Sequence, residues 1–504
     1  MCLPLNMRTL AVGLSMAASL ALAGPALASA APSKSPHVST RSKTSHGSAA
    51  TTLYISGGGF GHGIGMSQYG AYGYALHGWT YQQILAHYYT GTALSTTNPG
   101  QIVRVLLGSG SAAFAGATQV GDKPLNASLT YDVVPLANGS VKVVSQSNGK
   151  AVGTFSAPLT ATGPGPLSLA GVGTYRGSLE FRPNGSGGIY TVNVVGLDDY
   201  VQGVIAAEMP SSWSAQALDA QAVAARTYAI ATDVAGTFYN LYPDTRSQMY
   251  RGVAAETAAT DAAVAATSGQ IVTYNGAPAV TYFFASSGGY TEDVEDAWPG
   301  ATADPWLRGV SDPYDGAGAD PYHHWTRRMS LAAATKDLGK LVRGSLVGIR
   351  VTQHGASPRI MSASVIGTRG TTTVTGSQLA GAFGLLSTWA TFTAISSSVS
   401  PTPTPTATAT ATARPTQAEG DLAIIAQMKR AFGQIADDSQ TLRGAIFPAH
   451  KGAGATIQVR AGERWRKAFV VRLGAGGRYS VRLASAGVYR VVYRGLAGPS
   501  VDVR

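Results

Sequence analysis

The sequence contains a single cysteine, Cys2, and few charged residues. One cysteine cannot form an intramolecular disulfide, and it cannot build a cysteine-based metal site. Charged residues make up 12% of the 504 positions, whereas hydrophobic residues make up 45%. The chain therefore has enough apolar material for large cores, and it is too long for one ordinary domain.

The chain also lacks a hydrophobic run long enough to cross a membrane comfortably. Its N-terminal segment has Arg8, an apolar run over 10–23, and the small-residue patterns Ala-Leu-Ala and Ala-Ser-Ala over 26–30. This arrangement predicts a secretory signal peptide over residues 1–30, with a short membrane anchor as the alternative. Cleavage would remove Cys2, and we expect a secreted protein that is extracellular or associated with the cell wall.

The formal net charge is +11 and the pI is about 9.6. A basic excess suits anionic polymers, either nucleic acid or a phosphate-rich bacterial wall. Because the N-terminus predicts export, we expect no nucleic-acid partner.

Composition divides the rest of the chain into four segments. Residues 31–50 are rich in Ser, Lys, His and Thr and predict a flexible leader. A large region over 51–398 follows. The stretch 399–418 contains PTPTPTATATATARPT, which favours extended polyproline II and predicts a linker. Residues 419–504 form a small terminal unit.

Hydrophobic periodicity in the large region predicts both strands and helices. Alternating patterns predict strands over 101–107, 140–146, 189–196 and 346–353. Helical patterns cover 80–91, 214–236 and 261–269, and in the longest of them Ser214 is a plausible N-cap and Gly236 a plausible stop. This mixture predicts an α+β fold with a large β share.

In the terminal unit, apolar and polar residues alternate over short runs that are separated by glycine-rich turns. We expect a short helix near 423–432 and then strands over 456–462, 469–474, 479–487 and 488–495, which together predict a small antiparallel β sandwich. Its arginines occupy the polar positions of these strands: Arg460, Arg472, Arg482, Arg490 and Arg494. An ordinary solvated sheet face explains this pattern most simply, and a face that binds anionic wall polymer is the alternative.

A lone carboxylate, Glu208, stands before the long Ala-rich helical run. Helix capping is one explanation, but Pro210 and two serines place Glu208 in the loop before that helix. Neighbouring apolar side chains would desolvate the carboxylate, raise its pKa and suit it to general acid chemistry. On the helix itself, Gln221 and Tyr228 share one face, while Arg226 lies off it.

A second segment, 57–91, surrounds His62 with glycines and continues into Ser67, Gln68 and Tyr69. Glycines allow close backbone approach to a ligand, so this segment could line a sugar or peptide site; a structural glycine hairpin is the alternative. It lacks the strand–loop–helix context of a dinucleotide site and the lysine of a phosphate loop.

Two further segments are rich in polar side chains. One is DTRSQMYRG over 244–252, and the other is TYFFASSGGYTEDVEDAW over 281–298, in which hydroxyls beside glycines suit a polar ligand or an ordinary turn. No zinc-ligand spacing occurs: His323 and His324 are adjacent, and on a strand they would face opposite sides. No nucleophile elbow or Ser-His-Asp set is evident.

Four motifs together strongly resemble the SpoIID/LytB family. They are LDDYVQGVIAAEMPSSWSAQALDAQAVAARTYAI, DTRSQMYRG, TYFFASSGGYTEDVEDAW and GHGIGMSQYGAYGYALHGWTYQQILAHYYTGT. The resemblance covers roughly residues 54–392. In the sporulation members the glycine-histidine motif closes the domain, whereas here it opens it, so the order looks circularly permuted.

The resemblance implies a peptidoglycan lytic transglycosylase with Glu208 as its acid and base, acting on glycan strands after N-acetylmuramic acid and leaving 1,6-anhydro ends. A non-catalytic glycan-binding protein, or an enhancer of a cell-wall amidase, is the alternative. The expected substrate-binding residues are His62, Ser67, Gln68, Tyr69, Gln221, Arg226, Tyr228, Gln248, Tyr250, Ser286, Ser287 and Thr291. We expect His62 and Glu208 to meet in space.

The expected partners are peptidoglycan glycan strands, a cell-wall amidase and, through the terminal unit, anionic wall polymers. Sporulation members carry Cys and His before the Gln-x-Tyr element, where they can hold zinc. The segment NLYPDTRSQMY has neither residue, so we predict no metal and no cofactor.

Overall fold

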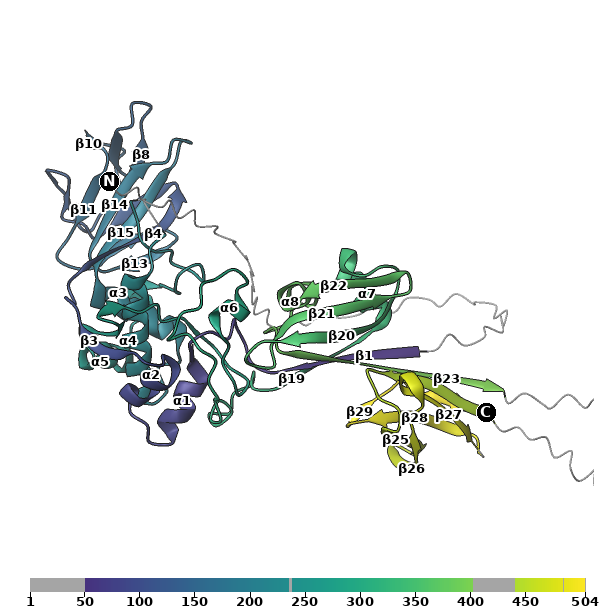
Figure 1. The fold of residues 1–504 in the computed structure, drawn as a ribbon. Helices are drawn as coiled ribbons and strands as arrows, with labels where there is room; N and C mark the ends of the chain where they lie inside the picture. The colour runs from purple at the N-terminus through teal and green to yellow at the C-terminus, as the bar shows by residue number, and fades with distance from the viewer. Residues whose placement is uncertain (1–49, 235–237, 402–439, 484, 504) are drawn as a thin grey trace, which may run out of the picture.

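The computed structural model describes residues 50–234, 238–401, 440–483 and 485–503 (Figure 1). The expected signal peptide, most of the leader, most of the linker and the expected helix near 423–432 lie outside the described residues. Helices and several sheets pack around four hydrophobic cores, so the α+β prediction is confirmed. Among the described residues, no helix has the length and apolarity needed to cross a membrane.

An antiparallel sandwich occupies the chain between 102 and 196. Its strands are β4 (Ile102–Gly110), β5 (Ala112–Ala115), β6 (Gln119–Val120), β7 (Lys123–Pro124), β8 (Tyr131–Pro135), β9 (Val141–Ser145), β10 (Ala151–Phe155), β11 (Leu159–Thr162), β12 (Leu167–Leu169), β13 (Gly173–Tyr175), β14 (Ser178–Pro183) and β15 (Ile189–Gly196). The sheets have the orders β10-β9-β8-β5-β12-β13 and β4-β15-β14-β11-β6-β7. Phe114 and Phe181 meet in their shared core with ring centroids 5.2 Å apart.

A helical layer, built from segments on both sides of the sandwich in the sequence, packs against it. It contains α1 (Gln68–Leu76), α2 (Tyr81–Tyr88), α3 (Leu197–Glu208), α4 (Ala215–Ala231), η1 (Gly252–Ala255), α5 (Ala258–Ala266) and α6 (Val294–Ala297), with a small sheet of β3 (Ala93–Thr96), β16 (Gln270–Tyr274) and β17 (Ala277–Pro278). Twelve of the 17 residues of α4 are buried, because its small side chains let α1, α2, α3 and α5 pack closely around it. The helices expected near 80–91, 214–236 and 261–269 are confirmed.

The long helix differs from its prediction at both ends. Ser214 is the N-cap by position, but its side chain makes no capping hydrogen bond. The helix stops at Ala231, and Gly236 lies outside the described residues. Thr232 caps the end instead: its hydroxyl donates to the carbonyl of Tyr228.

Two segments that are distant in the sequence cross at the edge of the helical layer. The short strand β2 (Met66–Ser67) runs parallel to β18 (Phe283–Phe284), and Phe60 and Ile64 form bridges with Ser286 and Glu292. Gly65 has a positive φ, and a side chain there would collide with the carbonyl of Tyr282. The glycine-rich segment therefore serves close contact between two backbones.

A third layer links this region to the terminal unit. It contains β1 (Ala50–Gly57), β19 (Trp325–Ser330), α7 (Leu331–Leu338), η2 (Gly339–Leu341), β20 (Leu346–His354), β21 (Ile360–Gly367), β22 (Gly370–Thr375), α8 (Gly376–Phe383) and the long strand β23 (Ala390–Pro401). β1 pairs with both β19 and β23, and these strands extend from the helical layer toward the terminal unit (Figure 1).

The terminal unit consists of two antiparallel sheets on one core. Its elements are β24 (Gln440–Phe447), β25 (Gly454–Ala461), β26 (Arg464–Arg472), η3 (Ala475–Gly477), β27 (Arg478–Leu483), β28 (Gly487–Tyr493), β29 (Leu496–Ala497) and β30 (Val501–Val503). The predicted strands of this unit are present. β24 also pairs with β23, so the sheet β19-β1-β23-β24-β27 is continuous across the two parts of the chain.

Candidate functional site

Glu208 is the last residue of α3, so the expectation that it lies in a loop was wrong. The run from 197 to 208 is helical because Leu197, Val201, Val204 and Ile205 supply a buried apolar stripe. Met209 has extended backbone and ends the helix immediately before Pro210. The carboxyl group is thus presented at a helix end.

The Glu208 side chain is partly buried and held from two sides. Its Oε1 accepts a hydrogen bond of 2.6 Å from the backbone N–H of Met249, and the Gln68 side chain supplies another hydrogen bond. Burial raises the pKa of Glu208, and these two donors lower it by less, so the pKa lies above its ordinary value. A carboxyl group in this state can carry a proton to a substrate and take one back.

Polar side chains gather around Glu208 from three segments. Gln68 of α1 donates a long hydrogen bond of 3.5 Å to Gln221 of α4. Gln248 donates to the hydroxyl of Tyr200 and to a carbonyl of α4. Burial raises the pKa of Tyr228 to about 12, with smaller contributions from Tyr282 and from the negative charge of Glu208. The Tyr228 hydroxyl is therefore close enough to Glu208 to sense its charge. The structure thus brings together Glu208, Gln68 and Tyr228.

Asp315, which the sequence did not single out, is the centre of a second polar cluster. It is fully buried and accepts five hydrogen bonds, from the hydroxyls of Ser67 and Ser286, the backbone N–H groups of Ser287 and Gly288, and Nδ1 of His323. Burial by itself would raise the pKa of Asp315, but the hydrogen bonds of His323 and Ser287 hold it below its ordinary value. Asp315 is therefore a buried carboxylate.

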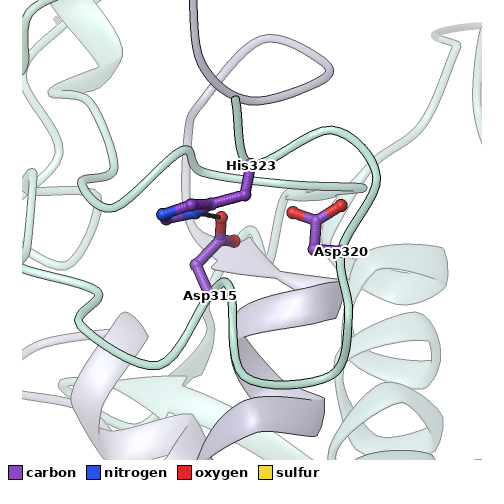
Figure 2. Close-up of side chains that lie close together, drawn as sticks. All are labelled: Asp315, Asp320 and His323. Carbon is purple, nitrogen blue, oxygen red and sulfur yellow. Dashed lines mark hydrogen bonds and ion pairs between the residues drawn. The ribbon is translucent and has the colours of Figure 1, made fainter. Parts of the chain in front are cut away.

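His323 is oriented by this carboxylate. Its Nδ1 lies 2.9 Å from Oδ2 of Asp315, and Nε2 is on the opposite side of the ring (Figure 2). With Nδ1 donating to Asp315, Nε2 is the atom that can accept or donate a proton. His323 and His324 are in ring contact at 4.2 Å and precede β19, so the expectation that they face opposite sides was wrong.

Asp315, Asp320 and His323 are also a candidate metal site. Their ligand atoms lie within 4.8 Å of one another, and Asp320 approaches from the other side of the cluster (Figure 2). Burial raises the pKa of Asp320 to about 6, although the hydroxyl of Ser286 donates to it. A cation would have to compete with the five hydrogen bonds that Asp315 already accepts, so the donor set favours orientation of His323 over metal binding.

We therefore expect the protein to be independent of divalent metals. Removal of metals with EDTA should leave the melting temperature and the activity unchanged, and so should added Zn²⁺ or Mn²⁺. A cation that binds the folded protein, at a free concentration of 100 times its Kd, would raise the free energy of unfolding by about 2.7 kcal/mol. Thermal melting with and without each cation measures this, and a rise that disappears in Asp320→Asn would establish a metal site.

Aromatic side chains connect the two clusters. Tyr69 contacts Trp213, which follows Glu208 in the chain, at 4.8 Å, and Tyr322, which precedes His323, at 6.0 Å. The three rings are only partly buried. Tyr69 thus joins a ring of the segment that follows Glu208 to a ring of the segment that carries His323, and such rings offer apolar faces with polar edges to a ligand.

Residues 185–274 match the SpoIID family, described as "Stage II sporulation protein". This range contains α3, α4, Glu208 and Met249, which are the elements that build the carboxyl site. The chain carries a SpoIID domain.

Three related proteins are similar to part of this chain. Stage II sporulation protein D of Bacillus subtilis is 35% identical over 174 residues, covering 31% of this chain and 50% of that protein. The amidase enhancer of Bacillus subtilis is 32% identical over 174 residues, covering 29% and 23%. An uncharacterized protein of Brachyspira hyodysenteriae is 34% identical over 169 residues, covering 32% and 45%. The matches span half or less of these relatives' own lengths.

His62 lies in an aromatic cluster and not against Glu208. Its ring contacts Tyr282, Phe284 and Trp298 at 5.2 to 6.1 Å, and its Nδ1 accepts the backbone N–H of Ile64. Burial and then the charge of Arg359 lower the pKa of His62 to about 4, so it is neutral at neutral pH. Among the described residues, His62 and Glu208 make no direct contact, whereas Tyr282, which His62 contacts, also contacts Tyr228.

Three of the expected substrate-binding residues belong to the interior of the domain. Arg226 is 0% exposed, and its Nε lies 2.5 Å from Asp198. The Tyr250 hydroxyl donates to Asn193 within a stack of buried tyrosines. Thr291 is fully buried and pairs with the backbone of Val310. These side chains stabilise the elements behind the site and do not reach a ligand, which corrects the expectation.

The remaining expected residues take indirect positions. Ser67, Ser286 and Ser287 are fully buried and hold Asp315, and Gln221 and Gln248 are buried behind Gln68 and Tyr200. Sequence reasoning missed Asp315 and Asp320, and it named His323 only to exclude a zinc-ligand spacing. Their signal was the glycine-rich segment DPYDGAGADPYHHW, in which three acids precede the histidine pair.

Proposed function

We propose that this protein is a cell-wall enzyme of the lytic transglycosylase class, with Glu208 as its only acid and base. The observation that carries the proposal is the partly buried Glu208, with a raised pKa, at the end of α3 within the SpoIID match. The name of the related sporulation protein and that of the amidase enhancer support a role at the cell wall. The N-terminal segment supports secretion.

The proposed reaction needs one carboxyl group. Protonated Glu208 gives its proton to the glycosidic oxygen that follows N-acetylmuramic acid, and the C–O bond breaks toward an oxocarbenium-like state. The carboxylate then takes the proton of the sugar's own 6-hydroxyl, whose oxygen attacks the anomeric carbon and closes the 1,6-anhydro ring. Water is not consumed, so the second carboxylate of a hydrolase is not required.

The surroundings of Glu208 suit both halves of this cycle. The N–H of Met249 and the amide of Gln68 hold the carboxyl group in place and stabilise its ionised form, while burial favours the protonated form. The partly exposed rings of Tyr69, Trp213 and Tyr322 supply faces on which sugar rings can pack.

The decisive assay is product analysis on glycan strands stripped of their stem peptides. We expect mass spectrometry to detect 1,6-anhydro-muramyl ends, 18 Da lighter than hydrolysis products because no water is added. Reducing ends in place of anhydro ends would contradict the transglycosylase reaction.

The second candidate function is enhancement of an amidase, favoured by the 32% identity to the amidase enhancer. In that case the chain alone releases no fragments from denuded glycan, yet it binds the glycan and speeds peptide release when an amidase is added. The two candidates therefore differ in whether the purified chain cleaves glycan without a partner.

The raised pKa of Glu208 predicts a pH dependence of both activity and stability. Activity should fall as pH rises through this pKa, because the proton donor is lost. The folded protein binds the proton more tightly than the unfolded chain, so this residue's contribution to the free energy of unfolding is present at low pH and declines as pH rises through the folded pKa.

Glu208→Gln removes this titration. Its melting temperature should therefore equal that of the wild type near pH 4 and match or exceed it at pH 7. Paired thermal melts across that range measure the difference. A wild type that becomes more stable than the variant with rising pH would contradict the raised pKa.

A further inference from the structure

The positive charge of the chain is concentrated in its terminal unit. From residue 440 to the C-terminus there are twelve lysines and arginines and two acidic residues, which is a net charge of +10 out of the chain's +11. Ten of these twelve cations are arginine. Arginine presents a planar fork of donors that fits phosphate and carboxylate oxygens, so this composition suits an anionic ligand.

Three exposed arginines converge on one open hollow of about 560 Å³. Arg443 comes from β24, Arg472 from the end of β26 and Arg478 from the start of β27. The pairing of β24 with β27 sets Arg443 opposite Ser480 and Ala445 opposite Arg478. Opposed and alternate residues share a face, so Arg443, Arg478 and Ser480 point to the same side of the sheet.

The hollow has no negative charge of its own. None of its lining residues is acidic, and within the described part of the chain Arg443, Arg472 and Arg478 form no ion pair. Arg472 uses one donor on the carbonyl of Gly452, and a guanidinium has five. Three cations that share a hollow repel one another, and a bound anion would relieve this repulsion.

We propose that this hollow is a binding site for a flexible phosphodiester polymer, one of its phosphates meeting the three guanidinium groups. A tetrahedral phosphate offers oxygens in several directions, which suits donors that arrive from three strands, whereas a planar carboxylate is filled by one guanidinium fork. Ser480 adds a hydroxyl donor at the same face.

Nucleic acid fits this hollow less well. Single-stranded nucleic acids bind through aromatic side chains on which bases stack. The only aromatic residue that lines the hollow is Tyr479, which is 5% exposed and donates its hydroxyl to Ser396. The site therefore offers contacts to the phosphates and none to bases, so the occupant is a phosphate-linked polyol or sugar chain.

The test measures binding of the full chain to fluorescent poly(glycerol phosphate). The triple variant Arg443→Gln, Arg472→Gln, Arg478→Gln should bind at least about 10-fold more weakly, and the slope of log Kd against log salt should fall by about 0.7, because one phosphate contact is lost. The matched control is Arg460→Gln, Arg464→Gln, Arg466→Gln at the far end of the β25–β26 hairpin, which removes the same charge and should change Kd less than about 3-fold.

Equal losses in the two triple variants would overturn the site, because diffuse charge would then explain binding. Binding of an oligothymidylate or of hyaluronan with equal charge as tightly as poly(glycerol phosphate) would overturn the assignment of the ligand. Thermal melting checks folding, and single Arg443→Gln and Arg472→Gln variants, each expected to weaken binding several-fold, replace the triple variant if it is unstable. Glu208→Gln should bind the polymer normally, so this result is independent of the proposed enzymatic function.

Discussion

Replacement of Glu208 by glutamine is expected to reduce the release of anhydro-muropeptides by a factor of about 10² to 10⁴, the usual contribution of general acid–base catalysis. Glutamine has nearly the same shape and can still accept the N–H of Met249 through its amide oxygen, but it has no proton to give to the glycosidic oxygen. The fold should be intact, because the substitution removes a partly buried group whose ionisation is disfavoured.

The matched control is Asp199→Asn, which makes the same kind of change in the first turn of the same helix, at an exposed position. It should retain full activity. The readout is the initial rate of anhydro-end formation on denuded strands, together with the Kd for those strands. If Glu208→Gln and the wild type release fragments equally, or if neither releases any while both bind, the chain is a glycan-binding protein or an enhancer.

Removal of the carboxylate that pairs with Arg226 is expected to cost about 3–5 kcal/mol of unfolding free energy. Arg226 is completely buried, with its Nε on Asp198 and its other nitrogens on the carbonyls of Gln270 and Val264. Burial lowers the pKa of Arg226 and the charge of Asp198 raises it. Asp198→Asn keeps the shape but leaves a buried guanidinium without its counterion.

The neighbouring substitution Asp199→Asn is again the control, since it should change stability by no more than about 1 kcal/mol. Arg226→Met should cost less than Asp198→Asn, because the Asp198 side chain is 20% exposed and water can solvate it. Urea denaturation followed by circular dichroism measures these differences. A loss below 1 kcal/mol for Asp198→Asn would contradict a buried ion pair that supports α3 and α4.

The sequence predicted the secondary structure correctly where a single hydrophobic periodicity, that of a helix or that of a strand, dominated a segment. The helices near 80–91 and 261–269 and the strands near 189–196 and 346–353 follow from simple hydrophobic patterns. Helix α3 was missed because it ends at Met-Pro and lies next to a longer and more regular helix. Local patterns also cannot show that β23 and β24, on the two sides of the linker, are neighbours in one sheet.

The sequence likewise identified some residues of the candidate site correctly and misassigned others. Glu208 stood out because charge is scarce and the residue lies in a quoted family motif. Arg226, Tyr250 and Thr291 are polar residues in the same motifs, and nothing local to them distinguishes a ligand-facing side chain from one that satisfies a buried partner. Burial depends on which segments cover a residue, and those segments are distant in the sequence.

By itself, the sequence determined the kind of fold, the lone carboxyl group and the concentration of arginine near the C-terminus, because composition, periodicity and motifs are local properties. Only the tertiary structure decided that Ser67, Ser287 and Asp315 orient His323, that Tyr69 contacts both Trp213 and Tyr322, and that three arginines from different strands share one hollow. These arrangements depend on strand register and on contacts between segments more than 200 residues apart, and the pattern of any one segment does not contain them.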